Sequence, residues 1–166
     1  MAKNNKAENK MFKIIAGVAA AVVVVVALVA VLVFKIGADR AVRDGNITSF
    51  SFSHGSYWSG DLDYVLTKQD NLALLTEKCM GCRNSFEVSK TVDGNYLGEV
   101  ADIIKKYEIA KWDGFNESDN VTDGEGFTLK VIYDDGKSIE AHGYMKFPTN
   151  YEEATDEFDK LFKKLR

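Results

Sequence analysis

The sequence predicts an α+β fold, an antiparallel sheet with two packed helices, preceded by one N-terminal transmembrane helix. Three observations support this prediction. The 166-residue chain contains 21 consecutive residues without a charged or polar side chain. Two later segments have apolar residues at the three- and four-residue spacing of an amphipathic helix. The segments around them alternate between apolar and polar side chains, as half-buried strands do. The length allows one ordinary domain in addition to the apolar run.

The apolar run, Ile14 to Phe34, is long enough to cross the hydrocarbon core of a bilayer. As a helix, such a run spans roughly 30 Å. A cleaved signal peptide is the main alternative, but its apolar stretch is usually shorter, and residues 34–39 form a poor cleavage site. The sequence therefore predicts a basic tip at 1–13, an uncleaved transmembrane helix at 14–34, a juxtamembrane stalk at 35–45 and a domain at 46–166.

The charge of the chain is unevenly distributed on the two sides of this run. Four of the 21 basic and one of the 25 acidic residues precede it, so the part after it has a formal charge of −7. The lysines before the run favour a cytoplasmic N-terminus. We therefore expect a single-pass protein of the cell membrane, with Ile14 to Phe34 contacting the lipid bilayer and the domain outside the cytoplasm. The negative charge disfavours nucleic acid as a partner, because phosphates are repelled.

Four strands are expected in the first half of the domain. Residues 48–52 and 62–66 alternate with period two, and glycine and serine residues between them indicate a turn. Residues 71–78 and 85–92 are predicted as two further strands. The sequence Cys79-Met80-Gly81-Cys82 is expected to form the bend between this second pair.

Two helices are expected in the second half of the domain. Apolar residues from Tyr96 to Tyr107 recur at three- and four-residue spacing. The second helix comes after Pro148 and begins near Asn150, where Asn150 and Glu153 fit the pattern of a capping box. Its buried stripe is expected to consist of Tyr151, Ala154, Phe158, Leu161, Phe162 and Leu165.

A hairpin is predicted between these helices, after a polar loop at 116–125. Residues 127–133 and 137–144 flank the turn sequence Asp134-Asp135-Gly136. A three-residue turn with Gly136 in the left-handed conformation would place the apolar residues of both strands on one face. The opposite face would then pair Thr128 with His142 and Lys130 with Glu140.

Cys79 and Cys82, the two cysteines of the chain, form a CxxC motif. Such a pair is a redox site, half of a zinc site or a structural disulfide. Thioredoxin-type chemistry requires the first cysteine at a helix N-terminus, whereas this motif is expected in a bend between strands. Zinc requires four ligands, and the chain offers only His54 and His142 besides. A local disulfide or two free thiols is favoured, with a redox pair as the alternative.

Four aromatic residues are candidates for a surface patch that binds a sugar or a peptide: Tyr57, Trp58, Trp112 and Phe115. Core packing or loop anchoring is the competing interpretation of the same residues. The acidic segment 119–125 resembles a calcium loop, but Val121 and Lys130 occupy positions where ligands belong. No catalytic residue, metal site or cofactor is predicted.

Several short motifs of the domain resemble a known family. They are Phe50-x-Phe52-x-x-x-Gly55-Ser56, Trp112-x-Gly114-Phe115, Asp123-Gly124-x-x-Phe127, Tyr133-x-Asp135-Gly136 and Gly143-x-x-x-x-Pro148-x-x-Tyr151. Together they resemble an uncharacterised family of small membrane-anchored or secreted proteins of gut-type, mostly Gram-positive bacteria, over most of residues 46–166. The resemblance implies a bacterial setting and no activity, cofactor or catalytic residue. The Cys79 and Cys82 pair departs from the common pattern of that family.

The expected function is that of a membrane-anchored protein displaying an interaction or ligand-binding domain outside the cytoplasm. Its partner would be an extracytoplasmic protein, peptide or glycan. The alternative is a thiol-disulfide redox protein that uses Cys79 and Cys82.

Overall fold

The computed structural model describes residues 46–164. The predicted basic tip at 1–13, transmembrane helix at 14–34 and stalk at 35–45 lie outside the described residues, as does Leu165. Within residues 46–164, no helix has both the length and the apolar character needed to cross a membrane.

Four consecutive strands form the first half of the domain, as the alternating pattern predicts. They are β1 (Ile47–Ser56), β2 (Gly60–Gln69), β3 (Leu72–Met80) and β4 (Phe86–Asp93). Each pairs antiparallel with the next. Phe50 and Phe52 of β1 are fully buried, while the serines that alternate with them, Ser49, Ser51 and Ser53, are partly exposed. The bend between β3 and β4 begins later than expected, because β3 continues through Cys79 and Met80 and the turn occupies residues 81–85.

The next segment confirms the predicted helix and corrects the predicted loop. Helix α2 (Asn95–Lys106) is followed by the short 3-10 helix η1 (Ile109–Trp112). Within the expected polar loop, β5 (Asn116–Ser118) pairs parallel with β7 (Ser138–Tyr144). All three residues of β5 are exposed, so no apolar alternation distinguishes this strand from a loop.

The predicted hairpin is confirmed in register. It consists of β6 (Glu125–Tyr133) and β7, with Thr128 opposite His142 and Lys130 opposite Glu140. The Lys130 Nζ atom lies 2.8 Å from Glu140 Oε1. Gly136 has a φ of 81°, the left-handed conformation that the three-residue turn requires.

Helix α3 (Tyr151–Lys163) buries every member of the predicted stripe that the structure describes, and its predicted capping box is wrong. Asn150 has a φ of 64° and makes no side-chain cap to the helix. N-cap residues that bond the first turn have extended backbone geometry, whereas the left-handed Asn150 side chain donates through Nδ2 to the Tyr107 carbonyl at 3.3 Å. The start of α3 is thereby joined to the end of α2.

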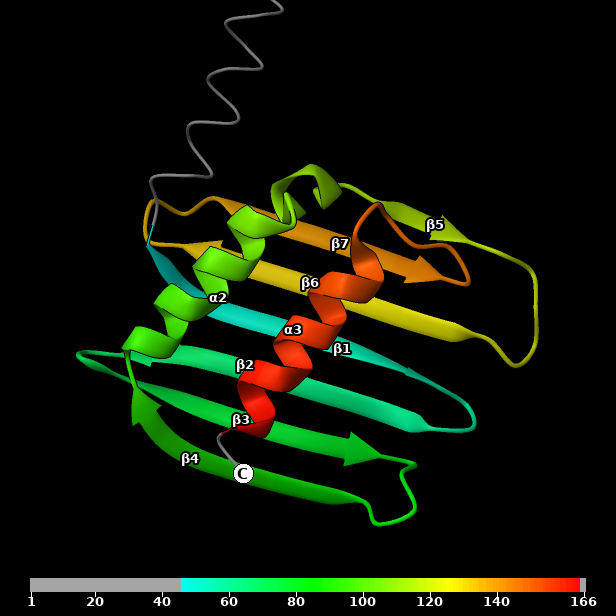
Figure 1. The fold of residues 1–166 in the computed structure, drawn as a ribbon, viewed down its shortest axis with the longest axis horizontal. Coiled ribbons are helices and arrows are strands. Elements are labelled where there is room, and N and C mark those ends of the chain that lie inside the picture. The colour runs from blue at the N-terminus through cyan, green and yellow to red at the C-terminus, as the bar shows by residue number, and fades with distance from the viewer. Residues whose placement is uncertain (1–45, 165–166) are drawn as a thin grey trace, which may run out of the picture. The chain divides into compact units, whose positions relative to one another are not determined.

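The seven strands of residues 46–164 form one sheet in the order β4-β3-β2-β1-β6-β7-β5. The α+β prediction with two helices is confirmed, and the sheet is mixed because β5 runs parallel to β7. Both helices cover the same face (Figure 1). Their apolar stripes pack on that face of the sheet, as in the stacked rings of Tyr64 and Phe162, whose centroids are 4.4 Å apart.

The two ends of the sheet are defined by the direction of β1. The described chain begins at Asn46, next to the start of β1, and the β1–β2 turn lies at the other end of that ten-residue strand. A strand of this length spans about 30 Å. We call the end away from Asn46 the distal end, and it comprises residues 57–61, 80–85, 119–125 and 145–146 (Figure 1).

Candidate functional site

An exposed aromatic pair projects from the distal end. Tyr57 and Trp58 form the turn between β1 and β2, and their side chains are 76% and 77% exposed. These are the highest values among the large hydrophobic residues of 46–164. The two rings contact each other edge to face, with centroids 5.3 Å apart and planes at 90°. We call Tyr57 and Trp58 the aromatic tip.

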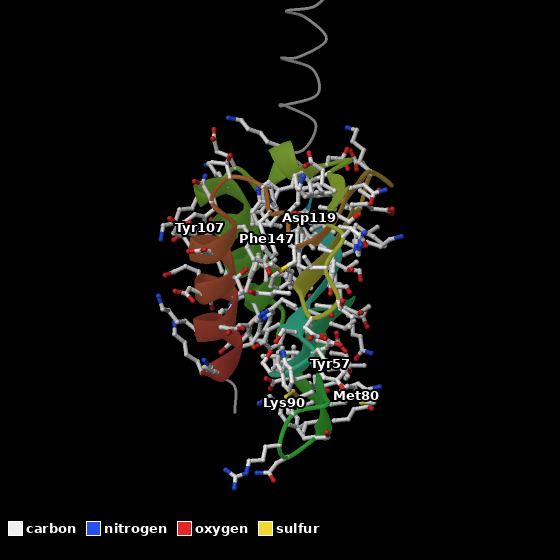
Figure 2. The ribbon with its side chains drawn as sticks, turned by 90° about the vertical axis from the view of Figure 1, so that its right-hand side faces the viewer. Tyr57, Met80, Lys90, Tyr107, Asp119 and Phe147 are labelled. Carbon is white, nitrogen blue, oxygen red and sulfur yellow. A yellow bond between two sulfur atoms is a disulfide. The ribbon has the colours of Figure 1, made fainter. Side chains whose placement is uncertain are left out.

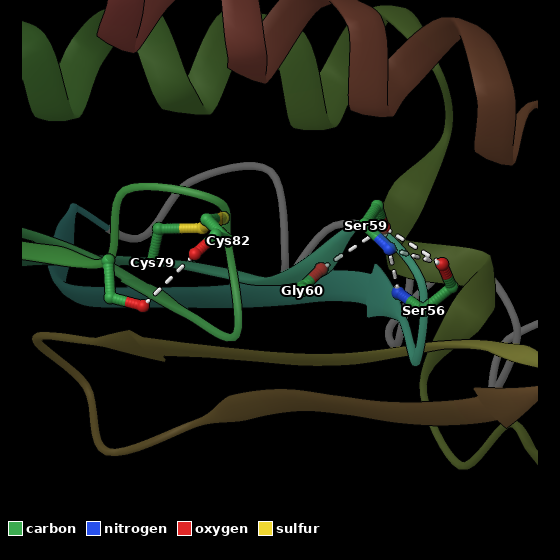
Figure 3. The surroundings of a disulfide bond; sticks show 6 residues. Ser56, Ser59, Gly60, Cys79 and Cys82 are labelled. Atoms are coloured by element: carbon green, nitrogen blue, oxygen red, sulfur yellow. Dashed lines mark hydrogen bonds between the residues drawn. A yellow bond between two sulfur atoms is a disulfide. The ribbon is translucent and has the colours of Figure 1, made fainter.

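Hydrogen bonds between two serines hold the backbone below the aromatic tip. The Ser56 amide donates to Ser59 Oγ and the Ser59 amide donates to Ser56 Oγ, each at 3.1 Å (Figure 3). Ser59 Oγ also donates to the Gly60 carbonyl at 3.2 Å. This exchange closes the turn, so the two aromatic residues are presented by a fixed backbone.

A disulfide lies in the neighbouring turn. Cys79 and Cys82 are bonded to each other, with Cα atoms 5.8 Å apart (Figure 3). Gly60 packs against this turn so closely that an added Cβ would lie 2.4 Å from the Cys82 nitrogen and 2.5 Å from the Met80 carbonyl oxygen. Gly60 also has a φ of 77°, which disfavours any side chain there. The disulfide turn therefore supports the aromatic tip from one side.

The CxxC geometry differs from that of a thioredoxin-type site. Cys79 belongs to β3 rather than to a helix N-terminus and is 2% exposed, while Cys82 is half-buried. Both sulfurs are used in the disulfide. In residues 46–164 no group of three or more histidine, cysteine, aspartate or glutamate side chains is placed to hold a metal ion.

The four aromatic candidates separate into two groups. Trp112 is 2% exposed and its Nε1 donates to the Thr149 carbonyl at 3.0 Å. Phe115 is half-buried, and both rings pack on Phe127 with centroids 5.9 and 6.1 Å away. Trp112 and Phe115 thus belong to the core, and only the aromatic tip is available on the surface.

Exposed apolar side chains gather at the distal end. Besides the aromatic tip, Met80, Val121 and Met145 are each between 43% and 52% exposed. Five of the eight exposed large hydrophobic residues of 46–164 therefore lie at this one end. Figure 2 views the distal end, where it labels Tyr57 and Met80.

The distal end also has an excess of acidic residues. Asp61 lies opposite Gly55 and Glu125 lies opposite Ser56 in the strand register, so both flank the aromatic tip. Asp119 and Asp123 are the other acids, and all four are exposed. The basic residues of the distal end are Arg83 and Lys146.

A half-buried polar cluster joins α3 to the sheet, and sequence reasoning missed it. His54 Nε2 lies 3.0 Å from Asp159 Oδ1, and the Tyr64 hydroxyl donates to the same oxygen at 2.8 Å. Burial raises the pKa of the Asp159 carboxyl. Hydrogen bonds from His54 and Tyr64, together with charge attraction to His54 and Lys163, outweigh this effect, so that pKa lies below its usual value. The contact joins residues 105 positions apart, and the cluster acts as a clamp between β1, β2 and α3.

Comparisons with known proteins leave the family open. No family model matches the chain, and no curated protein matches it either. The resemblance to small bacterial membrane-anchored or secreted proteins therefore stays a prediction. The candidate site rests on the geometry of the distal end alone.

Proposed function

We propose that the protein is a single-pass membrane protein that holds residues 46–164 outside the cytoplasm as a binding module. The observation that carries this proposal is the aromatic tip, two large rings about three-quarters exposed on a closed turn. Tryptophan and tyrosine are enriched among the residues that contribute most to binding. A turn that is already ordered loses little conformational entropy when a partner binds.

Two features support the location in this proposal. The run from Ile14 to Phe34 has the length and composition of a membrane anchor. The Cys79–Cys82 disulfide fits an oxidising compartment, because cysteine thiols in the cytoplasm are kept reduced. The tether would join the domain at Asn46, and the aromatic tip lies at the other end of β1.

Labelling of introduced cysteines tests the orientation. Lys68 is exposed, so a Lys68→Cys variant adds one reactive thiol to the domain, while Asn5→Cys adds one to the N-terminal tip. A membrane-impermeant maleimide is expected to label Lys68→Cys on intact cells and Asn5→Cys only after lysis. The reverse pattern would show that the domain is cytoplasmic.

Photo-crosslinking tests the binding element. Benzoylphenylalanine is placed at Trp58 in one variant and at Val88 in a control, because Val88 is 51% exposed but lies on β4 and outside the distal end. Illumination of cells is expected to give discrete adducts from position 58 and none from position 88. The absence of adducts at 58, or equal adducts at both positions, would refute a binding role for the aromatic tip.

A further inference from the structure

The chemistry around the aromatic tip indicates a class of partner. We infer that the distal end binds a cationic polypeptide and holds one of its lysine or arginine side chains against Tyr57 and Trp58. This inference rests on the proposed function. Three observations lead to this inference: the angle between the two rings, the charge beside them and the exposed apolar side chains at the same end of the sheet.

The ring geometry suits a cation better than a flat sugar. The planes of Tyr57 and Trp58 are perpendicular, so the pair presents ring faces in two directions rather than one continuous platform. A sugar stacks on a flat aromatic surface. An ammonium or guanidinium group is attracted to the face of each ring that it approaches, and aromatic cages for cations are built from rings set at angles to one another.

The charge next to the rings has the sign that such a partner requires. Asp61 and Glu125 flank the aromatic tip on its two neighbouring strands. The distal end as a whole has four acidic and two basic residues, Arg83 and Lys146 being the basic ones. Residues 46–164 together contain 22 acidic and 13 basic residues, a formal charge of −9. This field attracts a cationic chain and repels an anionic one, including an anionic lipid surface.

Exposed apolar residues elsewhere at the distal end add to this surface. Met80 and Met145 are 52% and 43% exposed. Methionine is flexible and fits partners of different shape. The aliphatic stems of lysine and arginine pack on apolar surface while their charged ends remain hydrated. The methionines therefore extend the contact beyond the two rings without specifying one sequence.

Titration of the isotopically labelled full chain in neutral detergent micelles tests the inference, with octalysine as the probe. The indole N–H signals of Trp58 and Trp112 are followed by NMR. We expect a saturable shift of the Trp58 signal and of the amides of Asp61 and Glu125, with the buried Trp112 signal unchanged. Octaglutamate and the neutral sugar chitohexaose are expected to cause no shift of the Trp58 signal. Added salt should weaken octalysine binding severalfold.

Variants separate the roles of the ring and of the charge. Trp58→Ala is expected to weaken octalysine binding about tenfold, and Asp61→Asn about threefold. Asp70→Asn is the matched control, because Asp70 is an exposed acid in the turn after β2, at the other end of the sheet. Its binding should equal that of the wild type. The unchanged remainder of the amide spectrum shows that each variant is folded.

Two results would overturn the inference. One is an octalysine shift that spreads over all acidic surfaces and is the same in Trp58→Ala, which would be unspecific charge attraction. The other is a Trp58 shift with chitohexaose and none with octalysine, which would leave the distal end a binding site but for a neutral sugar. The proposed function has a separate test: it fails if benzoylphenylalanine at position 58 gives no crosslinks in cells.

Discussion

Replacing Asp159 removes the acceptor that joins α3 to the sheet, and the cost can be worked from the structure. The Asp159 side chain is 21% exposed and accepts hydrogen bonds from His54 and Tyr64. A hydrogen bond to a charged group contributes about 1.5–3 kcal/mol, and the partial exposure places each bond near the lower value. Asp159→Ala should therefore lower the free energy of unfolding by about 3 kcal/mol. Asp159→Asn, which keeps an acceptor but not the charge, should lower it by about 1.5 kcal/mol.

The effect should depend on pH in a defined direction. The pKa of Asp159 is lower in the folded chain than its usual value, so the carboxylate stabilises the fold above the unfolded pKa of about 4. This contribution is lost as the pH falls through the folded pKa. The difference between the wild type and Asp159→Asn should therefore be full at about pH 7 and shrink progressively below about pH 4.

Urea unfolding followed by the fluorescence of the buried Trp112 measures these differences, since its ring lies 6.1 Å from that of Tyr151 in α3. Asp156→Asn is the matched control, because Asp156 is exposed on the same helix, and it should change stability by less than about 0.5 kcal/mol. The clamp would be refuted if Asp159→Ala cost no more than Asp156→Asn. It would also be refuted if the Asp159→Asn difference persisted unchanged to about pH 2.

Three further predictions concern the distal end. Replacing both Cys79 and Cys82 by alanine should lower the free energy of unfolding by about 2 kcal/mol, because the closed loop is short; a loss above about 4 kcal/mol in urea unfolding would contradict this. Gly60→Ala should cost at least about 2 kcal/mol, whereas Gly136→Ala, which has a similar φ but open space around it, should cost about 1 kcal/mol. Equal losses would refute the close packing. Trp58→Phe should remove most of the acrylamide quenching of tryptophan fluorescence, since the remaining indole is buried; unchanged quenching would place the exposed indole elsewhere.

Local sequence patterns were sufficient to predict much of the fold. The pairing of Lys130 with Glu140 results from a turn glycine and a period of two, both contained within about 20 consecutive residues. The stripe of α3 results from the helical period in the same way. Strand β5 could not be predicted, because its three residues are exposed and only its backbone bonds to β7 specify it.

The candidate site depended on contacts that a single sequence does not reveal. Trp58 and Trp112 are chemically the same, and only the packing of η1 on β6 makes one a core residue and the other a surface residue. The bond between His54 and Asp159 joins β1 to α3 across most of the domain. The one indication of this contact in the sequence was the position of Asp159, which borders the apolar stripe of α3.

The position of β1 has a mechanical consequence. Asn46 and the aromatic tip are at opposite ends of this strand, so tension between an anchored N-terminus and a bound partner would run along β1 itself. Antiparallel neighbours on both sides, β2 and β6, hold β1 along nearly its whole length. A load in this direction shears all of those hydrogen bonds together instead of opening them one after another. If the N-terminus is anchored and the aromatic tip binds a partner, this shear geometry would oppose unfolding of the domain under such a load.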